Sequence, residues 1–111
     1  MARTLEHFKQ DIINACDKIT QYITEHTFES FNKDSKTFDA VMMEFIVIGE
    51  AATHFPVEIR ERNPEIRWTS VVGLRNFLTH EYFEIDPQKI WNTAKVNIPE
   101  LKVQMESILL D

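Results

Sequence analysis

Glycine and cysteine are scarce in this sequence, with two glycines and one cysteine among 111 residues. The low glycine count disfavours β-rich folds with many turns, whereas 43% hydrophobic and 27% charged residues are typical of a compact helical protein. The single cysteine, Cys16, excludes an intramolecular disulfide. Because Cys16 lies on an apolar helical stripe, we expect a buried, reduced thiol, as is typical of cytoplasmic proteins.

The sequence also contains no long apolar run. Its first residues, MARTLEHFKQDII, lack the continuous apolar segment of a signal peptide, and no stretch approaches the ~18 residues that a membrane-spanning helix needs. We therefore expect a soluble cytoplasmic protein without a membrane partner. The length is typical of one domain, which we expect to span residues 1–111.

Basic residues are in the minority, with 12 Lys and Arg against 18 Asp and Glu and a net charge of −6. This balance disfavours non-specific nucleic-acid binding, which depends on clustered cations that contact phosphates. Net charge is an average over the whole surface, however, and a cleft can concentrate a few arginines. Dimerisation is one way to form such a cleft.

Apolar residues recur every three or four positions and predict amphipathic helices. We expect the first helix from Thr4 to about residue 25 and the second from residue 38 to 55, where Pro56 ends it. A third is expected to begin at Thr69 or Ser70 and to run to residue 83. Asp86 then caps a fourth. The stripes of the first, second and fourth helices are Leu5, Phe8, Ile12, Cys16, Ile19 and Ile23; Phe38, Val41, Phe45, Ile48, Ala52 and Phe55; Ile90, Ala94, Ile98, Leu101, Met105 and Ile108.

The remaining segments complete an all-α, up-and-down four-helix bundle. Residues 26–36 are interpreted as a connection, and residues 56–62 as a short extra helical turn. The fourth helix keeps its apolar phase across Pro99, so we predict one helix that is kinked there, since the proline ring clashes with the carbonyl of Lys95.

The residues best suited to chemistry are Arg75, His80 and Tyr82, which occur within eight positions. RNA cleavage without a metal needs a base for the 2′-hydroxyl, an acid for the leaving 5′-oxygen, and a cation that stabilises the phosphorane. Histidine titrates at about pH 6.5, and a guanidinium donates paired hydrogen bonds to phosphate. Arg75 and His80 suit these roles, but an arginine and a histidine five positions apart are also common in helices where the histidine is structural.

This segment and its surroundings resemble the HEPN superfamily, whose ribonucleases carry Arg-x-x-x-x-His. The closest resemblance is to the HepT-type toxins, in which the pattern extends to Arg-x-x-x-x-His-x-Tyr. The similarity covers nearly the whole chain and is carried by residues 45–52 (FIVIGEAA), 73–76 (GLRN), 80–83 (HEYF) and 98–101 (IPEL).

The resemblance implies a HEPN-like fold and a metal-independent endoribonuclease that cleaves tRNA or mRNA as the toxin of a type VII-like toxin–antitoxin system. It implies no cofactor and no metal. It further implies a homodimer with a composite RNA-cleaving cleft and a nucleotidyltransferase antitoxin, similar to MntA, that adds AMP to the toxin. By this resemblance Arg75 and His80 are catalytic, and Tyr82 is the residue that is modified.

Ideal helical geometry does not bring the two catalytic residues together. At about 100° per residue, Arg75 and Tyr82 share a face, whereas Arg75 and His80 lie about 140° apart. Three explanations stay open: the helix distorts or ends near Thr79, the long arginine side chain wraps round the helix, or a second protomer completes the site.

Two further residues are candidates for supporting roles. Glu50 lies off the apolar stripe of the second helix and can line the cleft, while Asn76 can orient Arg75 or contact phosphate. Glu50 and His54 are four apart and could in principle bind a metal, but no third ligand is evident. Gly49 is interpreted as a point of close approach between helices.

Two other classes of function remain open. One is a helical module that only binds a protein partner, and the other is a nucleotide-binding HEPN domain without nuclease activity. Neither requires Arg75 and His80 for cleavage.

Overall fold

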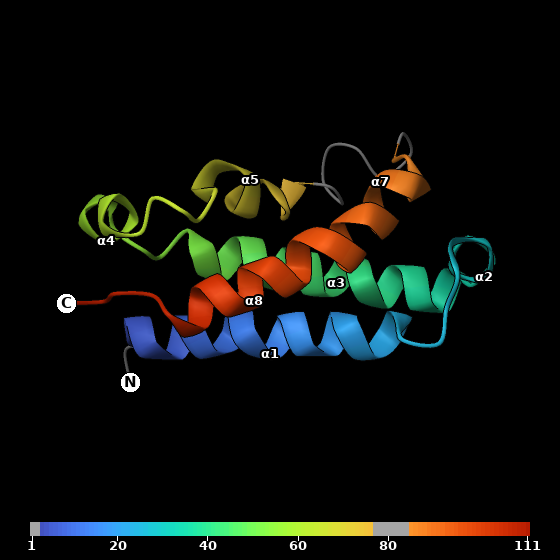
Figure 1. Cartoon of the computed structure of the whole chain (residues 1–111), viewed down its shortest axis with the longest axis horizontal. Coiled ribbons are helices and arrows are strands. Elements are labelled where there is room, and N and C mark those ends of the chain that lie inside the picture. The colour runs from blue at the N-terminus through green and yellow to red at the C-terminus, as the bar shows by residue number, and fades with distance from the viewer. Residues whose placement is uncertain (1–2, 77–84) are drawn as a thin grey trace.

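A computed structural model of the chain describes residues 3–76 and 85–111, and these residues form an all-helical bundle (Figure 1). The predicted all-α class is confirmed. The elements are α1 (Leu5–Ile23), α2 (Phe28–Lys33), α3 (Ser35–Ala52), α4 (Val57–Arg62), α5 (Trp68–Gly73), α7 (Pro87–Asn92), the π-helical turn η2 (Thr93–Asn97) and α8 (Ile98–Glu106).

The two longest helices, α1 and α3, pack against each other, and α1 also packs against α8. Helix α1 begins where the sequence predicts, because Thr4 and His7 form a reciprocal cap in which each side chain accepts a hydrogen bond from the other's backbone N–H. Asp34 caps α3 through the backbone N–H of Thr37.

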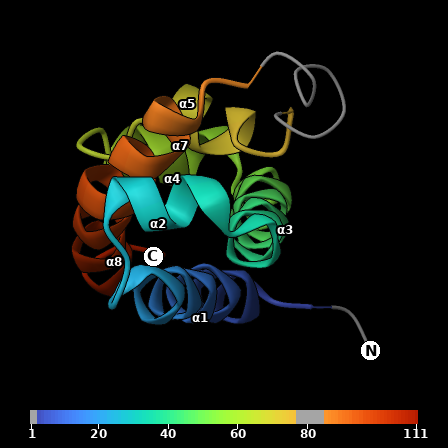
Figure 2. The ribbon, with the colours of Figure 1, turned by 90° about the vertical axis from the view of Figure 1, so that its right-hand side faces the viewer.

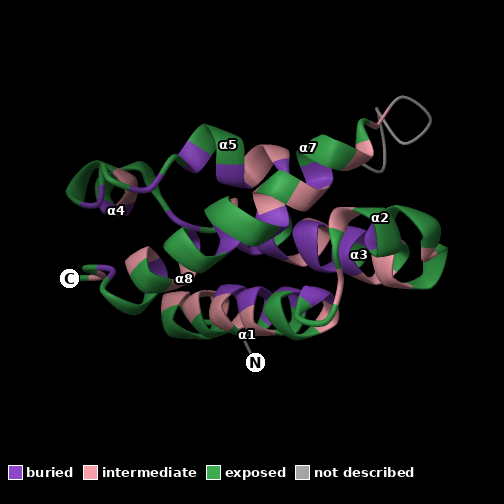
Figure 3. Cartoon of the chain, turned by 45° about the vertical axis from the view of Figure 1, so that its right-hand side comes forward, coloured by how far each residue is buried: buried purple, intermediate pink, exposed green. Residues whose placement is uncertain are grey.

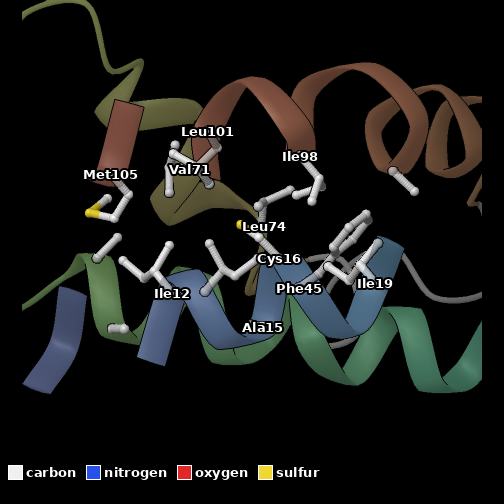
Figure 4. Close-up of a cluster of buried hydrophobic side chains, with 14 of the residues drawn as sticks. Ile12, Ala15, Cys16, Ile19, Phe45, Val71, Leu74, Ile98, Leu101 and Met105 are labelled. Carbon is white, nitrogen blue, oxygen red and sulfur yellow. The ribbon is translucent and has the colours of Figure 1, made fainter. Parts of the chain in front are cut away.

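The predicted apolar stripes form one core between the helices. The stripe of the fourth helix is buried throughout, and so are the central residues of the stripes on α1 and α3. Figure 3 shows this burial on the facing sides of the helices, and Figure 4 shows Ile19 of α1 close to Phe45 of α3, with Cys16 and Ile12 further along the same cluster. The periodicity therefore predicted the core correctly.

The last helix is continuous across Pro99, as predicted, and its irregularity is the π turn η2. Residues Thr93–Asn97 immediately precede Ile98, and Pro99 is in the first turn of α8. Pro99 has no N–H to donate to a carbonyl in the preceding turn, and a π turn is one way in which a helix rearranges its hydrogen bonds at such a point.

The structure differs from the sequence-based assignments at residues 26–36 and at the start of the third helix. The connection expected at residues 26–36 contains α2, whose cap is Thr27 and whose Phe31 is fully buried. Figure 2 shows α2 across one end of the bundle. The third helix begins at Trp68 rather than Thr69 or Ser70 and has no side-chain cap, since the indole of Trp68 is held in the core by a hydrogen bond to the Asn63 carbonyl.

Within residues 3–76 and 85–111, no helix combines the length and apolar character that crossing a bilayer demands.

Candidate functional site

Arg75 lies in a turn directly after α5. The helix ends at Gly73, and the backbone N–H groups of Leu74 and Arg75 donate to the carbonyls of Val71 and Val72 at 3.1 and 3.3 Å. The third helix was predicted to continue through this point, but Arg75 is outside the regular helix. The premise of that angle, an ideal helix that passes through Arg75, is therefore not met.

The backbone of Arg75 packs directly on Gly49 in the middle of α3. A Cβ atom at position 49 would lie 2.6 Å from the backbone nitrogen of Arg75 and 2.9 Å from the carbonyl oxygen of Val72, distances that real Cβ atoms do not reach. The close approach expected at Gly49 is confirmed, and it brings the two helices together at the arginine.

The side chain of Arg75 forms an ion pair with Glu50, the residue after Gly49. Its Nη1 atom donates to Glu50 Oε1 at 3.1 Å, and the two side chains are 40% and 57% exposed, respectively. A pair this exposed contributes little to stability, about 0–1 kcal/mol. The guanidinium is thus positioned at the surface, where water or an anionic ligand can reach it.

Apolar surface adjoins this ion pair on α3. Met43, Val47 and Glu50 are spaced by four and three residues and so share one face of the helix. Met43 is 55% exposed, and Val47 is partly buried. Part of the surface of α3 beside Arg75 is therefore apolar.

Asn76, the residue after Arg75, is exposed. It lines a pocket of about 460 Å³ between α5 and the helix formed by α7, η2 and α8. Sequence reasoning did not identify this pocket, because its walls are 13 or more residues apart in the chain and no local pattern brings them together.

The residues described here hold no group of three or more His, Cys, Asp and Glu side chains that could bind a metal. Glu50 pairs with Arg75, whereas His54 stacks on Phe8 of α1 with ring centroids 4.0 Å apart. The two side chains considered as a metal pair therefore have different partners.

His80 and Tyr82 lie outside the residues that the structure describes. Of the five site residues predicted from the sequence, Arg75 and Glu50 are in contact, and Asn76 is the residue next to Arg75.

Comparison with known proteins gives a consistent result. A family model described as "Ribonuclease HepT-like" matches residues 12–108. A protein of Thermococcus cleftensis named "Probable ribonuclease HepT" is 35% identical over 97% of this chain and 98% of its own. A "Putative RNase" of Methanocaldococcus jannaschii is 36% identical over 98% and 94% of the two chains. Another, of Caldanaerobacter subterraneus, is 33% identical over 96% of each. No solved structure matches significantly.

Proposed function

The chain belongs to the HepT-like ribonuclease family, and we propose that it is a metal-independent endoribonuclease that cleaves tRNA or mRNA as the toxin of a toxin–antitoxin pair. One observation carries this proposal. Gly49 and Glu50 together hold Arg75, the first residue of the Arg-x-x-x-x-His pattern, with its guanidinium at the surface.

In the proposed reaction the 2′-oxygen attacks the phosphorus, and the 5′-oxygen leaves. Arg75 donates hydrogen bonds to the phosphate oxygens and stabilises the charge of the phosphorane. His80 accepts the 2′-hydroxyl proton or gives a proton to the leaving oxygen. The products are a 2′,3′-cyclic phosphate and a 5′-hydroxyl. Glu50 orients the guanidinium before substrate binds, and Asn76 adds a contact to the RNA.

Cleavage of an RNA oligonucleotide by purified protein in the presence of EDTA tests this function. Arg75→Ala and His80→Ala should each lower the rate by about 10²-fold or more while the circular dichroism spectrum stays helical. The same oligonucleotide with a 2′-deoxy sugar at the cut should be inert. Wild-type rates in either folded variant, or loss of activity on chelation, would rule out this mechanism.

We propose that the active form is a homodimer. The exposed apolar surface of α3 beside Arg75 supports this, because a two-fold axis there would place two arginines in one cleft. Light scattering at micromolar concentration should give twice the mass of the chain, and Met43→Lys should shift the protein toward monomer. A wild-type monomer at that concentration would contradict the proposal.

Tyr82 is the proposed site of control by a nucleotidyltransferase antitoxin. Each AMP joined to its phenol would add a negative phosphodiester and an adenosine where substrate phosphate binds, so repulsion and bulk would both block RNA. Tyr82→Phe should keep much of the cleavage activity and gain no AMP mass increment from the cognate transferase. Modification that persists in this variant, or that maps to Tyr22, would show that another residue is the target.

A further inference from the structure

The pocket beside Asn76 is a groove with two helical walls. One wall is α5, and the other is the continuous helix of α7, η2 and α8, which runs in the opposite direction (Figure 1). Its volume of about 460 Å³ is within the range of about 300–1,000 Å³ that is typical of ligand-binding sites.

The floor of the groove is apolar. Val71 and Leu74 of α5 meet Ile98 and Leu101 of α8 there, and all four side chains are at least 92% buried (Figure 4). A flat apolar face, such as that of a nucleobase, would complete the packing above this floor.

The rim of the groove is polar and carries a local excess of positive charge. Among the lining residues that the structure describes, Arg67 and Lys89 are the cations and Glu100 is the anion. This described part of the lining is therefore net positive in a protein whose overall charge is −6. Because the walls are antiparallel, Lys89 lies at the end near Asn76, and Arg67 lies at the far end.

Amide side chains supply hydrogen bonds between the two cations. Asn76, Asn97 and Gln104 line the groove, and such amides can both donate to and accept from the edge of a base. Asn97 and Thr93, which also lines the groove, are the two ends of the π turn η2. Turns of this kind are frequent at functional sites.

From this arrangement we propose that the groove binds the single-stranded part of the RNA substrate next to the cut phosphate. The inference rests on the proposed function and deepens it, since the groove begins at Asn76, the residue after Arg75. A base would lie on the apolar floor, and strand phosphates would contact Lys89 and Arg67. Double-stranded RNA would bind poorly, because its bases are stacked and paired and cannot enter the groove.

The test compares kcat/KM for a single-stranded oligoribonucleotide with kcat/KM for a dinucleotide that spans only the cut bond. Arg67→Gln should lower the ratio of the two values by about fivefold, and Glu100→Gln should raise it by a similar factor, because each removes one charge from the rim. Val103→Ser, an exposed change on α8 outside the groove, should keep both wild-type values.

Filling the groove gives a second test that does not depend on charge. Among the residues that the structure describes, a Cβ at Gly73 would meet no atom within 4 Å, and its backbone is not in the left-handed region, so Gly73→Leu adds bulk from an unobstructed Cβ. It should lower the same ratio at least tenfold.

Salt dependence is a third test, and it concerns the charge of Arg67. Arg67→Gln should reduce the slope of log affinity against log salt by about 0.7, the value for one phosphate contact with a single strand.

The outcomes separate the groove from the proposed function. If Arg67→Gln and Gly73→Leu both fold and keep the wild-type ratio, the groove proposal is wrong, whether or not a protein partner occupies it. If the wild type cleaves neither substrate, the proposed function fails. In that case the groove is tested by the affinity of the protein for a 2′-O-methyl RNA oligonucleotide, and Arg67→Gln must weaken this affinity. Absence of any RNA binding would overturn the groove as well.

Discussion

At the scale of single residues, the position of Arg75 depends on Gly49, which has no side chain and packs against the backbone of Arg75. A glycine in the middle of a helix costs about 0.5–1 kcal/mol relative to alanine. At position 49 the missing side chain allows α3 to approach the turn that carries Arg75, and no space is left there for a methyl group. A Cβ at Gly73 would contact none of the residues that the structure describes, so the two glycines of the chain have different roles.

Gly49→Ala should therefore impair cleavage although alanine is the better helix former. The added methyl group must push away the backbone of Arg75 or Val72, which displaces the guanidinium from Glu50. We expect the rate of RNA cleavage to fall at least about tenfold, because small displacements of catalytic groups are costly. The rate is measured at a temperature at which circular dichroism shows the variant to be folded.

Gly73→Ala is the matched control for stability. Its methyl group meets nothing within 4 Å, so the melting temperature should not fall, whereas Gly49→Ala should lower it. Equal cleavage by wild type and folded Gly49→Ala would show that the close approach does not position Arg75.

Cys16 is a residue whose ionisation is linked to stability. Burial raises the pKa of its thiol from 9.0 to about 12, with a further contribution from the Asp17 carboxylate. The folded state disfavours the thiolate. The contribution of the neutral Cys16 thiol to the free energy of unfolding is therefore fully present below pH 9 and is lost as the pH rises toward 12.

The stability advantage of wild type over Cys16→Ala should thus shrink as the pH is raised through this window. Urea unfolding at several pH values measures it. In native protein at pH 8, Cys16 should also resist iodoacetamide until the chain unfolds. Rapid alkylation of the native thiol would contradict its burial.

At the scale of helices, the sequence predicted elements whose apolar stripe faces the core. The stripes on α1, α3 and the last helix have the period of a helix throughout and were recognised. Helix α2 has only six residues and one buried side chain, Phe31, which is too little to show a period. The start of α5 was misplaced because a tertiary contact of Trp68, rather than a capping side chain, determines it.

The C-terminal end of α3 illustrates a similar dependence on tertiary contacts. Arg60, on α4, donates through Nη2 to the carbonyl of Ala52 at 3.2 Å and through Nε to that of Phe55 at 2.8 Å. Its guanidinium also lies 5.6 Å from the ring centroid of Trp68. One side chain therefore joins α3, α4 and α5.

Arg60→Ala should lower the free energy of unfolding by about 2 kcal/mol, because it removes two charge-assisted hydrogen bonds and a cation–π contact. Arg60→Lys should recover only part of this, since an ammonium cannot reproduce the planar, two-sided geometry. Urea denaturation measures both. The control is Arg62→Ala, two residues further along α4 and exposed, which should change stability little. If Arg60→Ala matches that control, Arg60 does not stabilise the end of α3.

At the scale of the whole molecule, Asn63 ties the C-terminal segment to the bundle. Its side chain is 1% exposed, accepts from the backbone N–H of Leu109 at 2.8 Å, and donates to the carbonyls of Leu109 and Ile59 at 2.9 and 2.8 Å. The two bonds with Leu109 join residues 46 positions apart. No periodicity in the sequence predicts such a contact, and the same is true of the groove between α5 and α8.

Asn63→Asp should lower the free energy of unfolding by about 2 kcal/mol or more, because a carboxylate cannot donate to the two carbonyls and would be buried with its charge. Carboxypeptidase should also shorten the variant faster than the wild type. Asn92→Asp is the matched control, since Asn92 is exposed and uses only its oxygen, as an acceptor from Gln88. Equal stability of the two variants would contradict this role of Asn63.

The order of α5 and α8 along the chain has a consequence for the timing of synthesis. Met105 of α8, which is fully buried, is made after Arg75. At about 5–20 residues per second, the ribosome needs about 2–6 s to extend the chain from Arg75 to Met105. During that interval α1 lacks one of the two long helices that pack against it, and the groove lacks one wall. For a ribonuclease that is itself translated from RNA, this order imposes a delay, because the folded core cannot form until the codons of α8 have been read.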